Sequence, residues 1–357
     1  MTNKLHKDRS SRPVATWLLV GIFMIIIQVL LGGITRLTGS GLSITEWNPI
    51  MGALPPMNGQ EWNIAFEKYK QIAQFKYLNS HFTLEDFKFI FFWEWFHRLW
   101  ARLIGVVFII PFTIFIIQKR IKKEMIRPLI ILFLLGALQG LVGWIMVQSG
   151  LEDSDLLYVS HYKLAIHFIL ALGLLCYALW FALQLLIKSR QLLYKQSLRN
   201  FIGWIIGLLI VQLVYGAFMA GLKAATAAPT WPDINGSWLP ANTSSFGERH
   251  FTGLSVLTAH PLVVHFIHRN LAYVIIILVS IWTFNAFRSG GSELFRKARS
   301  LPLTIAFLQV VLGILTVLFS INQTSFLWLA VAHQFVAMVF LLSLVLMIYI
   351  IRGAKTV

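Results

Sequence analysis

Long apolar segments alternate with short polar ones along nearly the whole chain. Eight runs are rich in Leu, Ile, Val and Phe and contain few charges: residues 14–34, 89–117, 128–148, 160–187, 201–221, 262–287, 301–320 and 326–351. A helix that crosses a bilayer needs about 20 apolar residues, and each run reaches that length. The pattern therefore predicts an all-α membrane protein with eight transmembrane helices.

The composition agrees with this prediction and excludes a soluble globule. Of the 357 residues, 57% are hydrophobic and only 12% are charged, whereas a soluble protein carries about 25% charged residues. The one cysteine, Cys176, lies in an apolar run and forms neither an internal disulfide nor a thiolate metal site. The apolar run after the basic start is too long for a signal peptide, and no transit segment rich in Arg and Ser precedes it, so we expect a bacterial cytoplasmic membrane location.

Basic residues gather on one side of the eight-helix arrangement. The formal net charge is +16, and 19 of the 30 Lys and Arg lie in segments 1–13, 118–127, 188–199, 288–299 and 352–357, together with only three of the 14 acids. The positive-inside rule assigns these segments, and hence both termini, to the cytoplasm. Topology thereby accounts for the positive charge, and we predict no nucleic-acid partner.

The two long connections, residues 35–88 and 222–261, then face the other side of the membrane. They contain Trp47, Pro49, Pro55, Pro56 and Trp62 in the first, and Trp231, Pro232, Trp238 and Pro240 in the second. Tryptophan is typical of the interfacial aromatic belt, with proline in turns, but the same residues suit loops that cap a site. The sequence leaves both interpretations open.

The chain contains an internal repeat. Gln28 and Gly32 in the first run recur at the same spacing as Gln212 and Gly216 in the fifth. The offset also relates Trp47 to Trp231, Gly52 to Gly236 and Pro56 to Pro240, and further matches are Gln139–Gly143 with Gln309–Gly313 and His97–Arg98 with His268–Arg269. We predict two four-helix halves, 1–199 and 200–357, related by a pseudo-twofold axis along the membrane normal. A glycine one turn from a glutamine also predicts a close helix contact with a hydrogen bond beside it.

Four of the ten histidines occupy equivalent places in the apolar runs. His97, His167, His268 and His333 each lie within about 10 residues of the start of an even-numbered run, in one layer toward the outer surface. Ionisable residues inside a membrane are expensive and usually functional. A lone histidine would more often be a helix–helix hydrogen bond, but one pair in each half suits two imidazoles on either side of a porphyrin. We therefore predict two haem sites rather than zinc sites, which usually include a carboxylate or thiolate.

Arginines near these histidines are candidates for binding the haem propionates, because Arg binds carboxylates in a fork. Arg98 and Arg269 each follow a histidine directly, Arg102 lies one turn beyond Arg98, and Arg36 is near the outer side. The alternative is that such side chains snorkel to lipid headgroups.

The two halves differ beside the first histidine. Glu94 precedes His97 by three residues, whereas His265 occupies the matching place before His268. The carboxylate either pairs with Arg98, four residues away, or acts as an acid, base or charge stabiliser beside a haem edge. This asymmetry suggests that the first half performs chemistry and that the second holds a permanent redox haem.

Several segments in combination resemble the haem A synthase family over nearly the whole chain. They are the stretch from Gln28 to Ser43, Trp47-x-Pro49-x-x-Gly52-x-x-Pro55-Pro56, Glu94-x-x-His97-Arg98, His161-Tyr162-Lys163-Leu164-Ala165-x-His167, Phe266-Ile267-His268-Arg269-x-x-Ala272-Tyr273 and Ala332-His333-Gln334. The length and the long first loop are similar to the branch shared by alphaproteobacteria and mitochondria. The other branch has a cysteine pair in its outer loop, and mechanisms that use this pair do not transfer to this chain.

The resemblance implies an oxidoreductase that converts the C8 methyl group of haem O to a formyl group by two hydroxylations, giving haem A for cytochrome c oxidase. His97 and His167 would hold the substrate haem, and His268 and His333 would ligate the iron of a haem b cofactor. Glu94 would act at the methyl group, as base or as stabiliser of a cationic intermediate. Two axial histidines leave no open iron position, which favours electron removal and attack by water over oxygen activation.

Other functions stay open on the sequence. A two-haem electron carrier would turn over no haem and would need no Glu94. An assembly factor that hands over haem unaltered is not separable by sequence, and a transporter would call for broken helices at mid-depth, which are not evident. The electron acceptor is open, as is a homo-oligomer, and a haem O synthase (protohaem farnesyltransferase) is the partner we consider for delivery of haem O.

Overall fold

The computed structural model describes residues 11–46, 51–151, 157–240 and 242–353. Within these ranges, eight helices are long and apolar enough to cross a membrane. They are α2 (Ser11–Leu37), α5 (Leu84–Ile117), α6 (Lys123–Leu151), α7 (His161–Leu186), α8 (Gln196–Gly221), α11 (Pro261–Arg288), α13 (Leu301–Leu318) and α14 (Gln323–Ile350). Each coincides with one predicted apolar run, so the prediction of a multi-pass, all-α membrane protein is confirmed.

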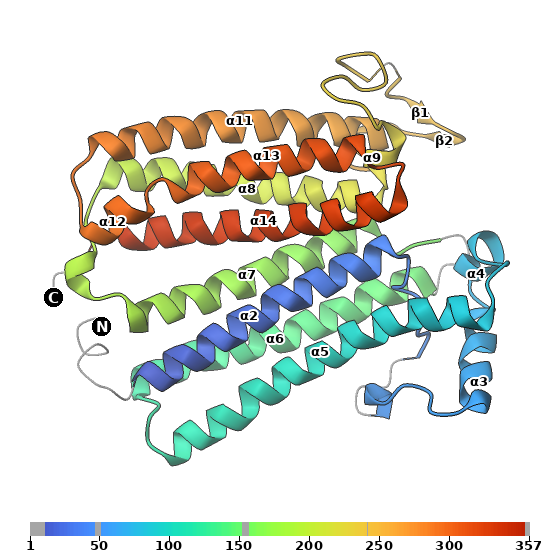
Figure 1. The fold of residues 1–357 in the computed structure, drawn as a ribbon, viewed down its shortest axis with the longest axis horizontal. Helices are drawn as coiled ribbons and strands as arrows, with labels where there is room; N and C mark the ends of the chain where they lie inside the picture. Colours follow the sequence, from blue (N-terminus) through green and yellow to red (C-terminus); the bar gives the residue numbers. More distant parts are fainter. Residues whose placement is uncertain (1–10, 47–50, 152–156, 241, 354–357) are drawn as a thin grey trace.

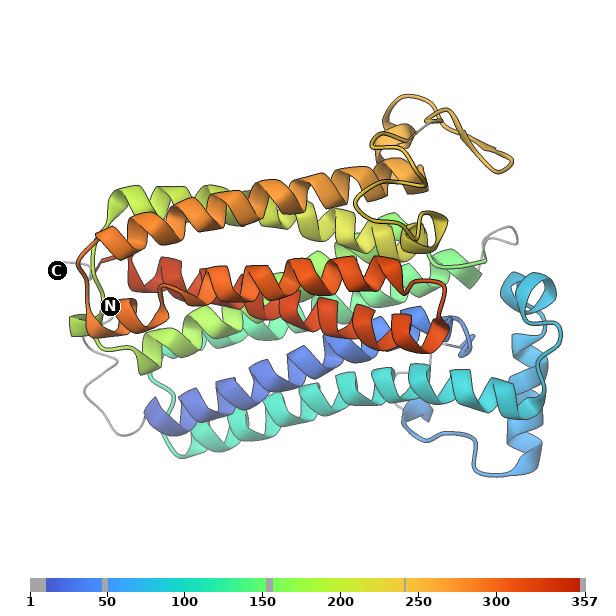
Figure 2. The same cartoon turned by 45° about the horizontal axis from the view of Figure 1, so that its top comes forward.

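The spanning helices lie side by side and alternate in direction (Figures 1 and 2). Within the first half of the chain, α2 packs against α5 and α7, and α6 packs against α7. Within the second half, α8 packs against α11, α11 against α13, and α13 against α14. The helices of the first half and those of the second half form two sets. They are joined by contacts of α7 with α8 and of α14 with α2, α7 and α8.

Burial differs strongly among these helices. Fully buried apolar side chains are frequent on α7 and α14, where the two sets meet. By contrast, α5 and α6 expose large apolar side chains along much of their length, including Ile110, Ile117 and Leu134. Such a surface is unfavourable in water but matches the acyl chains of a bilayer.

Helix α2 begins and α14 finishes at one end of the bundle, and the longer connections gather at the other end, here named the loop end (Figure 1). Helices α5, α7, α11 and α14 start at the loop end. The shorter elements are η1 (Met51–Ala53), α3 (Gly59–Tyr69), α4 (Ala73–Leu78), η2 (Ser189–Gln191), α9 (Ala224–Ala227), β1 (Ser245–Phe246), β2 (Arg249–His250), α10 (Leu254–Ala259) and α12 (Glu293–Ala298). Strands β1 and β2 pair antiparallel, with Ser245 opposite His250.

The first long connection is folded around a small aromatic core of its own. Phe66 and Tyr69 of α3 stack on Phe87 of α5, and Trp62 packs edge-on against Phe91 at 5.0 Å between ring centroids. Helix α5 can extend beyond the apolar run because Thr83 and Asp86 form a capping box at its start. Trp62 therefore belongs to a packed core, while Trp47 and Pro49 lie outside the described residues, as do both ends of the chain.

A buried polar network fastens this aromatic core to the spanning helices. The Tyr69 hydroxyl donates to Gln74 Oε1 at 3.0 Å and accepts from Asn79 Nδ2 at 2.7 Å. Gln74 Nε2 donates onward to the carbonyls of Gly39 and Leu157, which lie beyond the ends of α2 and α6. Burial raises the pKa of Tyr69 to about 12, although the hydrogen bond from Asn79 opposes this shift. The phenol therefore stays protonated and remains a donor.

We expect Tyr69→Phe to destabilise the loop end, because it leaves Gln74 Oε1 buried without its donor. The loss should be about 1–3 kcal/mol, measured as a lower thermal midpoint of the protein in detergent. Tyr77→Phe is the matched control, since Tyr77 lies in the same segment and is 72% exposed. Equal midpoints for the two variants would contradict the role of this network.

Candidate functional site: two pairs of membrane histidines

Each of the four membrane histidines faces a glutamine on the preceding spanning helix. In the first half, Gln28 Nε2 lies 3.2 Å from His97 Nδ1, and Gln139 Nε2 lies 3.2 Å from His167 Nδ1. In the second half, Gln212 Nε2 lies 3.4 Å from His268 Nε2, and Gln309 Nε2 lies 3.2 Å from His333 Nε2. The helix pairs are α2 with α5, α6 with α7, α8 with α11, and α13 with α14. The predicted hydrogen bond beside each glutamine–glycine pair is confirmed, and its partner is the histidine.

Four glycines allow the imidazole rings to lie directly against the facing helix. A Cβ atom added at Gly32 would lie 3.1 Å from Cε1 of His97, and one added at Gly143 would lie 2.8 Å from Cε1 of His167. The corresponding distances are 3.3 Å from Gly216 to His268 and 2.9 Å from Gly313 to His333. Packed carbon atoms normally stay about 3.5–4.0 Å apart. Glycine is therefore needed here for space, and the predicted close helix contacts are confirmed.

The second pair, His268 and His333, has the separation of two ligands on one metal. The ring centroids are 6.5 Å apart and the rings are inclined by 75°. Two imidazoles bound to opposite sides of one ion by bonds of about 2 Å have centroids roughly 6 Å apart. His268 and His333 would thus fit as the two protein ligands of a haem iron.

Unpartnered polar atoms around this pair also fit a site completed by a bound group. Within the described residues, Nδ1 of His268 and of His333 and Oε1 of Gln212 and of Gln309 are buried without a hydrogen-bond partner. A metal-bound imidazole uses one nitrogen for the metal and donates its other N–H to a nearby acceptor. A turned glutamine amide would supply that acceptor, so these residues suit haem ligation.

The first pair, His97 and His167, has the same glutamine and glycine neighbours as the second. Oε1 of Gln28 and of Gln139 is again buried and unpartnered among the described residues. The described parts of the chain contain no cluster of three or more His, Cys, Asp or Glu side chains arranged for a metal. Histidine pairs without such a cluster suit a porphyrin better than a zinc ion.

Glu94 lies one turn before His97 and is 2% exposed. Its Oε2 atom accepts from the Ser43 hydroxyl at 2.7 Å and from the Ile44 amide at 2.9 Å, and its Oε1 atom accepts from Arg98 Nη2 at 2.5 Å. The ion pair that the spacing allowed is therefore present. Its negative charge is matched within the protein, and the carboxylate holds the loop after α2 next to the first histidine pair.

Both arginines that follow a histidine bind the loop of their own half. Arg98 donates to the carbonyls of Ile44 and Glu46, at 3.0 and 3.1 Å. Arg269 donates to the Asp233 carbonyl at 2.6 Å and lies over the Trp238 ring at 5.4 Å. Nε and Nη2 of Arg269 are buried without a partner among the described residues, so this guanidinium has donors for an anionic group.

The other two predicted arginines lie in different settings. Arg36 Nη2 donates to the carbonyls of Ala220 and Gly221, at 2.8 and 2.9 Å, and thus caps the end of α8 across the two sets of helices. Its guanidinium also lies 5.0 Å from the Tyr158 ring centroid. Arg102 is half-buried on α5, one turn beyond Arg98. A propionate contact stays a prediction for both.

Sequence reasoning missed the partners of several site residues. Gln28 and its three counterparts were visible in the repeat, but nothing in the pattern identified the histidines as their partners. Ser43 belongs to the segment that carries the family resemblance, and only the fold brings it to Glu94. His265 does occupy the place of Glu94 in the second half, where it is buried and Nδ1 has no partner in the described chain.

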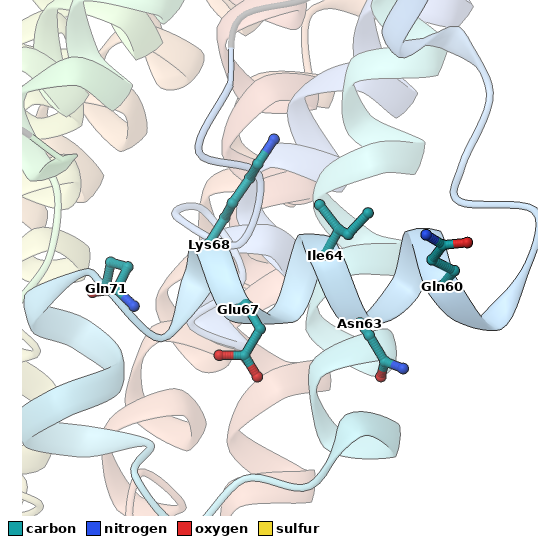
Figure 3. A pocket seen from close by; sticks show the side chains of 6 residues that line it. All are labelled: Gln60, Asn63, Ile64, Glu67, Lys68 and Gln71. Atoms are coloured by element: carbon teal, nitrogen blue, oxygen red, sulfur yellow. The ribbon is translucent and has the colours of Figure 1, made fainter.

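A large open recess of about 640 Å³ lies elsewhere, along α3. In Figure 3, Lys68 and Ile64 project from one side of this helix, and Glu67 and Asn63 project from the other. The side chains do not converge on one point, and Lys68 forms an ion pair with Glu46. This recess is therefore not a candidate for the chemistry of the histidine pairs.

Comparison with known proteins shows the family to which the chain belongs. The family model of COX15-CtaA, described as a cytochrome oxidase assembly protein, matches residues 15–345. A heme A synthase of Flavobacterium psychrophilum is 39% identical over 336 residues, covering 93% of this chain and 96% of that protein. A heme A synthase of Rhodospirillum centenum is 42% identical over 354 residues, covering 97% and 90%, and one of Paramagnetospirillum magneticum is 40% identical over 346 residues, covering 96% and 93%. The chain therefore belongs to the COX15-CtaA family of cytochrome oxidase assembly proteins.

Proposed function

We propose that this protein is a membrane oxidoreductase that converts haem O to haem A. The observation that carries the proposal is the two pairs of histidines, each histidine with a glutamine beside it. Among the described residues, only the first pair has a buried carboxylate one turn away. The names and coverage of its relatives support the same activity. A pure electron carrier would give no role to the buried carboxylate of Glu94.

In this proposal, residues 1–199 form the substrate half and residues 200–357 form the cofactor half. His97 and His167 hold haem O, and His268 and His333 hold haem b. Bound there, haem b would supply one-electron redox chemistry. Arg269 would bind a propionate through its unpartnered nitrogens, since a guanidinium pairs well with a carboxylate.

The oxidation of the C8 methyl group would take its oxygen from water and use no dioxygen. Each hydroxylation removes two electrons and two protons and adds the oxygen of one water molecule to the carbon. The second hydroxylation gives a gem-diol, which loses water to form the formyl group. The electrons pass to the second half and then to an external acceptor.

Glu94 would act in this reaction as a stabiliser of positive charge at the methyl carbon rather than as the proton acceptor. Its two oxygens already accept from Ser43, Ile44 and Arg98, which hold the carboxylate in place as an anion. A fixed charge beside a developing cation lowers the barrier because no reorganisation is needed during the reaction.

The location follows from the charge pattern. We propose a bacterial cytoplasmic membrane, with both termini in the cytoplasm and the loop end on the opposite side. The histidine pairs would then lie toward the extracytoplasmic surface. Haem O, which carries a long apolar tail, would arrive from a membrane-bound haem O synthase.

We expect Gly313→Ala to lower the haem b content of the purified protein several-fold. The added methyl group would lie 2.9 Å from His333 Cε1 and push the ring away from its ligand position. The measurement is haem b per protein by the pyridine haemochrome assay. Gly207→Ala on α8 is the control, because nothing lies within 4 Å of its added Cβ. Full haem b content in Gly313→Ala would contradict ligation by His333.

We expect Glu94→Gln to reduce haem A formation roughly a hundredfold, because the fixed negative charge is removed. Haem would be extracted and identified by mass from membranes that make haem O, with and without the protein. Glu85→Gln is the matched control, since Glu85 is on the same helix and its side chain is 78% exposed.

Because an unpaired Arg98 would destabilise the first half, retention of haem O by the purified variant serves as the folding readout for Glu94→Gln. Haem A formation at the normal rate in this variant would remove Glu94 from the mechanism. Haem O left untouched by the unmodified protein would instead favour the electron carrier.

We expect the oxygen of the product to come from water. The reaction would be run under ¹⁸O₂ in ordinary water, and the hydroxymethyl intermediate would be analysed by mass, because its C–O bond does not exchange with solvent. The intermediate should carry no label. Incorporation of one ¹⁸O atom would overturn the water mechanism while leaving the site assignment intact.

A further inference from the structure

The two histidine pairs approach each other along the contact between α2 and α14. Gln334 directly follows His333, and its Nε2 atom donates to the Val29 carbonyl of α2 at 3.1 Å. Val29 in turn directly follows Gln28, which contacts His97 at 3.2 Å. One side chain thus connects the helix that carries His333 with the helix that contacts His97.

This contact is fitted into a notch in α2. A Cβ atom added at Gly33 would lie 2.0 Å from Gln334 Oε1, so any larger residue at that position would displace the amide. Gly33 stands next to Gly32, whose lack of a side chain makes room for the His97 ring at 3.1 Å. Consecutive glycines on α2 therefore receive His97 on one side and Gln334 on the other.

The equivalent junction on the other side of the protein is built differently. There Phe168 follows His167, and Ala217 follows Gly216, at the positions that correspond to Gln334 and Gly33. Phe168 packs with Ala217 and Phe218 in an apolar cluster between α7 and α8. At this junction, an aromatic ring packed against alanine is therefore enough to fill the contact between the two helices.

The Val29 carbonyl does not need Gln334 as its hydrogen-bond donor. The Val29 carbonyl lies in the middle of α2, where the helix supplies its partner. Placing an amide at an interior helix contact carries a desolvation penalty that one hydrogen bond only partly offsets. Gln334 with glycine opposite thus joins α14 to α2 by a hydrogen bond, whereas the other junction has apolar packing.

We propose that Gln334 is the connection through which electrons pass from the first histidine pair to the second. The route runs from His97 across the contact to Gln28, along the backbone to Val29, through the hydrogen bond to Gln334, and along the backbone to His333. The inference rests on the proposed function. In each transfer, the porphyrin held by His97 and His167 loses one electron and the oxidised haem b held by His268 and His333 gains it, with no bond made or broken.

The test uses zinc protoporphyrin as a photoexcitable donor in the first half of the full-length protein, purified with oxidised haem b in the second half. A laser flash excites the zinc porphyrin, and transient absorption measures the rate at which haem b is reduced. Because no haem A is formed, this rate is independent of catalysis. A claimed pathway needs such direct evidence of coupling.

Gln334→Met is the main variant, since methionine has a similar length but no hydrogen-bond donor. We expect it to slow haem b reduction several-fold, with zinc protoporphyrin affinity and the haem b spectrum unchanged. Phe168→Leu is the matched control at the apolar junction and should leave the rate unchanged. An unchanged rate in Gln334→Met, or equal slowing in both variants, would overturn the proposal.

Gly33→Ala covers the case in which Gln334→Met fails to retain haem b. It keeps Gln334 but displaces its amide, and we expect the same slowing. Loss of haem b in both variants would show that the junction only supports packing and would overturn the inference. Failure of zinc protoporphyrin to bind, or binding that survives the double change His97→Ala and His167→Ala, would overturn the proposed function and the inference together.

Discussion

An imidazole inside a membrane needs a partner for each ring nitrogen, because no water is present to supply one. Beside each of four imidazoles the protein places one device, a glutamine and a glycine one turn apart on the neighbouring helix, and among the described residues Nδ1 of His268 and of His333 is left for a bound group. The glycine admits the ring and the glutamine supplies polar atoms beside it. The same device sets how closely each helix pair approaches, so the site and the packing of the bundle have a common origin.

The two halves differ in the residues that surround this device. In the first, the guanidinium of Arg98 is engaged by Glu94 and by loop carbonyls, so a carboxylate is held rigidly beside His97. In the second, Arg269 retains two nitrogens without partners in the described chain, and His265 replaces the carboxylate. Under the proposed function, the fixed charge would serve the substrate half and the free donors would serve the half that holds the anionic cofactor.

The connections at the loop end are part of this division. The first contains a packed aromatic core, and its polar network reaches the ends of α2 and α6 through Gln74. The second places Trp238 over Arg269 and joins Trp231 to Tyr273 on α11 at 2.9 Å. These contacts favour the interpretation that the tryptophans cap the sites. They fit less well with tryptophans that form only an interfacial belt. Trp47 lies outside the described residues and takes no part in this argument.

The sequence alone determined the eight spanning helices, since apolar length is a local property that a bilayer enforces. It also identified the four histidines, Glu94 and the repeated glutamines, because polar residues stand out in apolar runs. Which groups meet depended on helix rotation and packing, which are set by contacts between residues distant in the chain. Only the tertiary structure therefore paired Glu94 with Ser43, directed Arg36 to the end of α8, and placed Gln334 against Gly33.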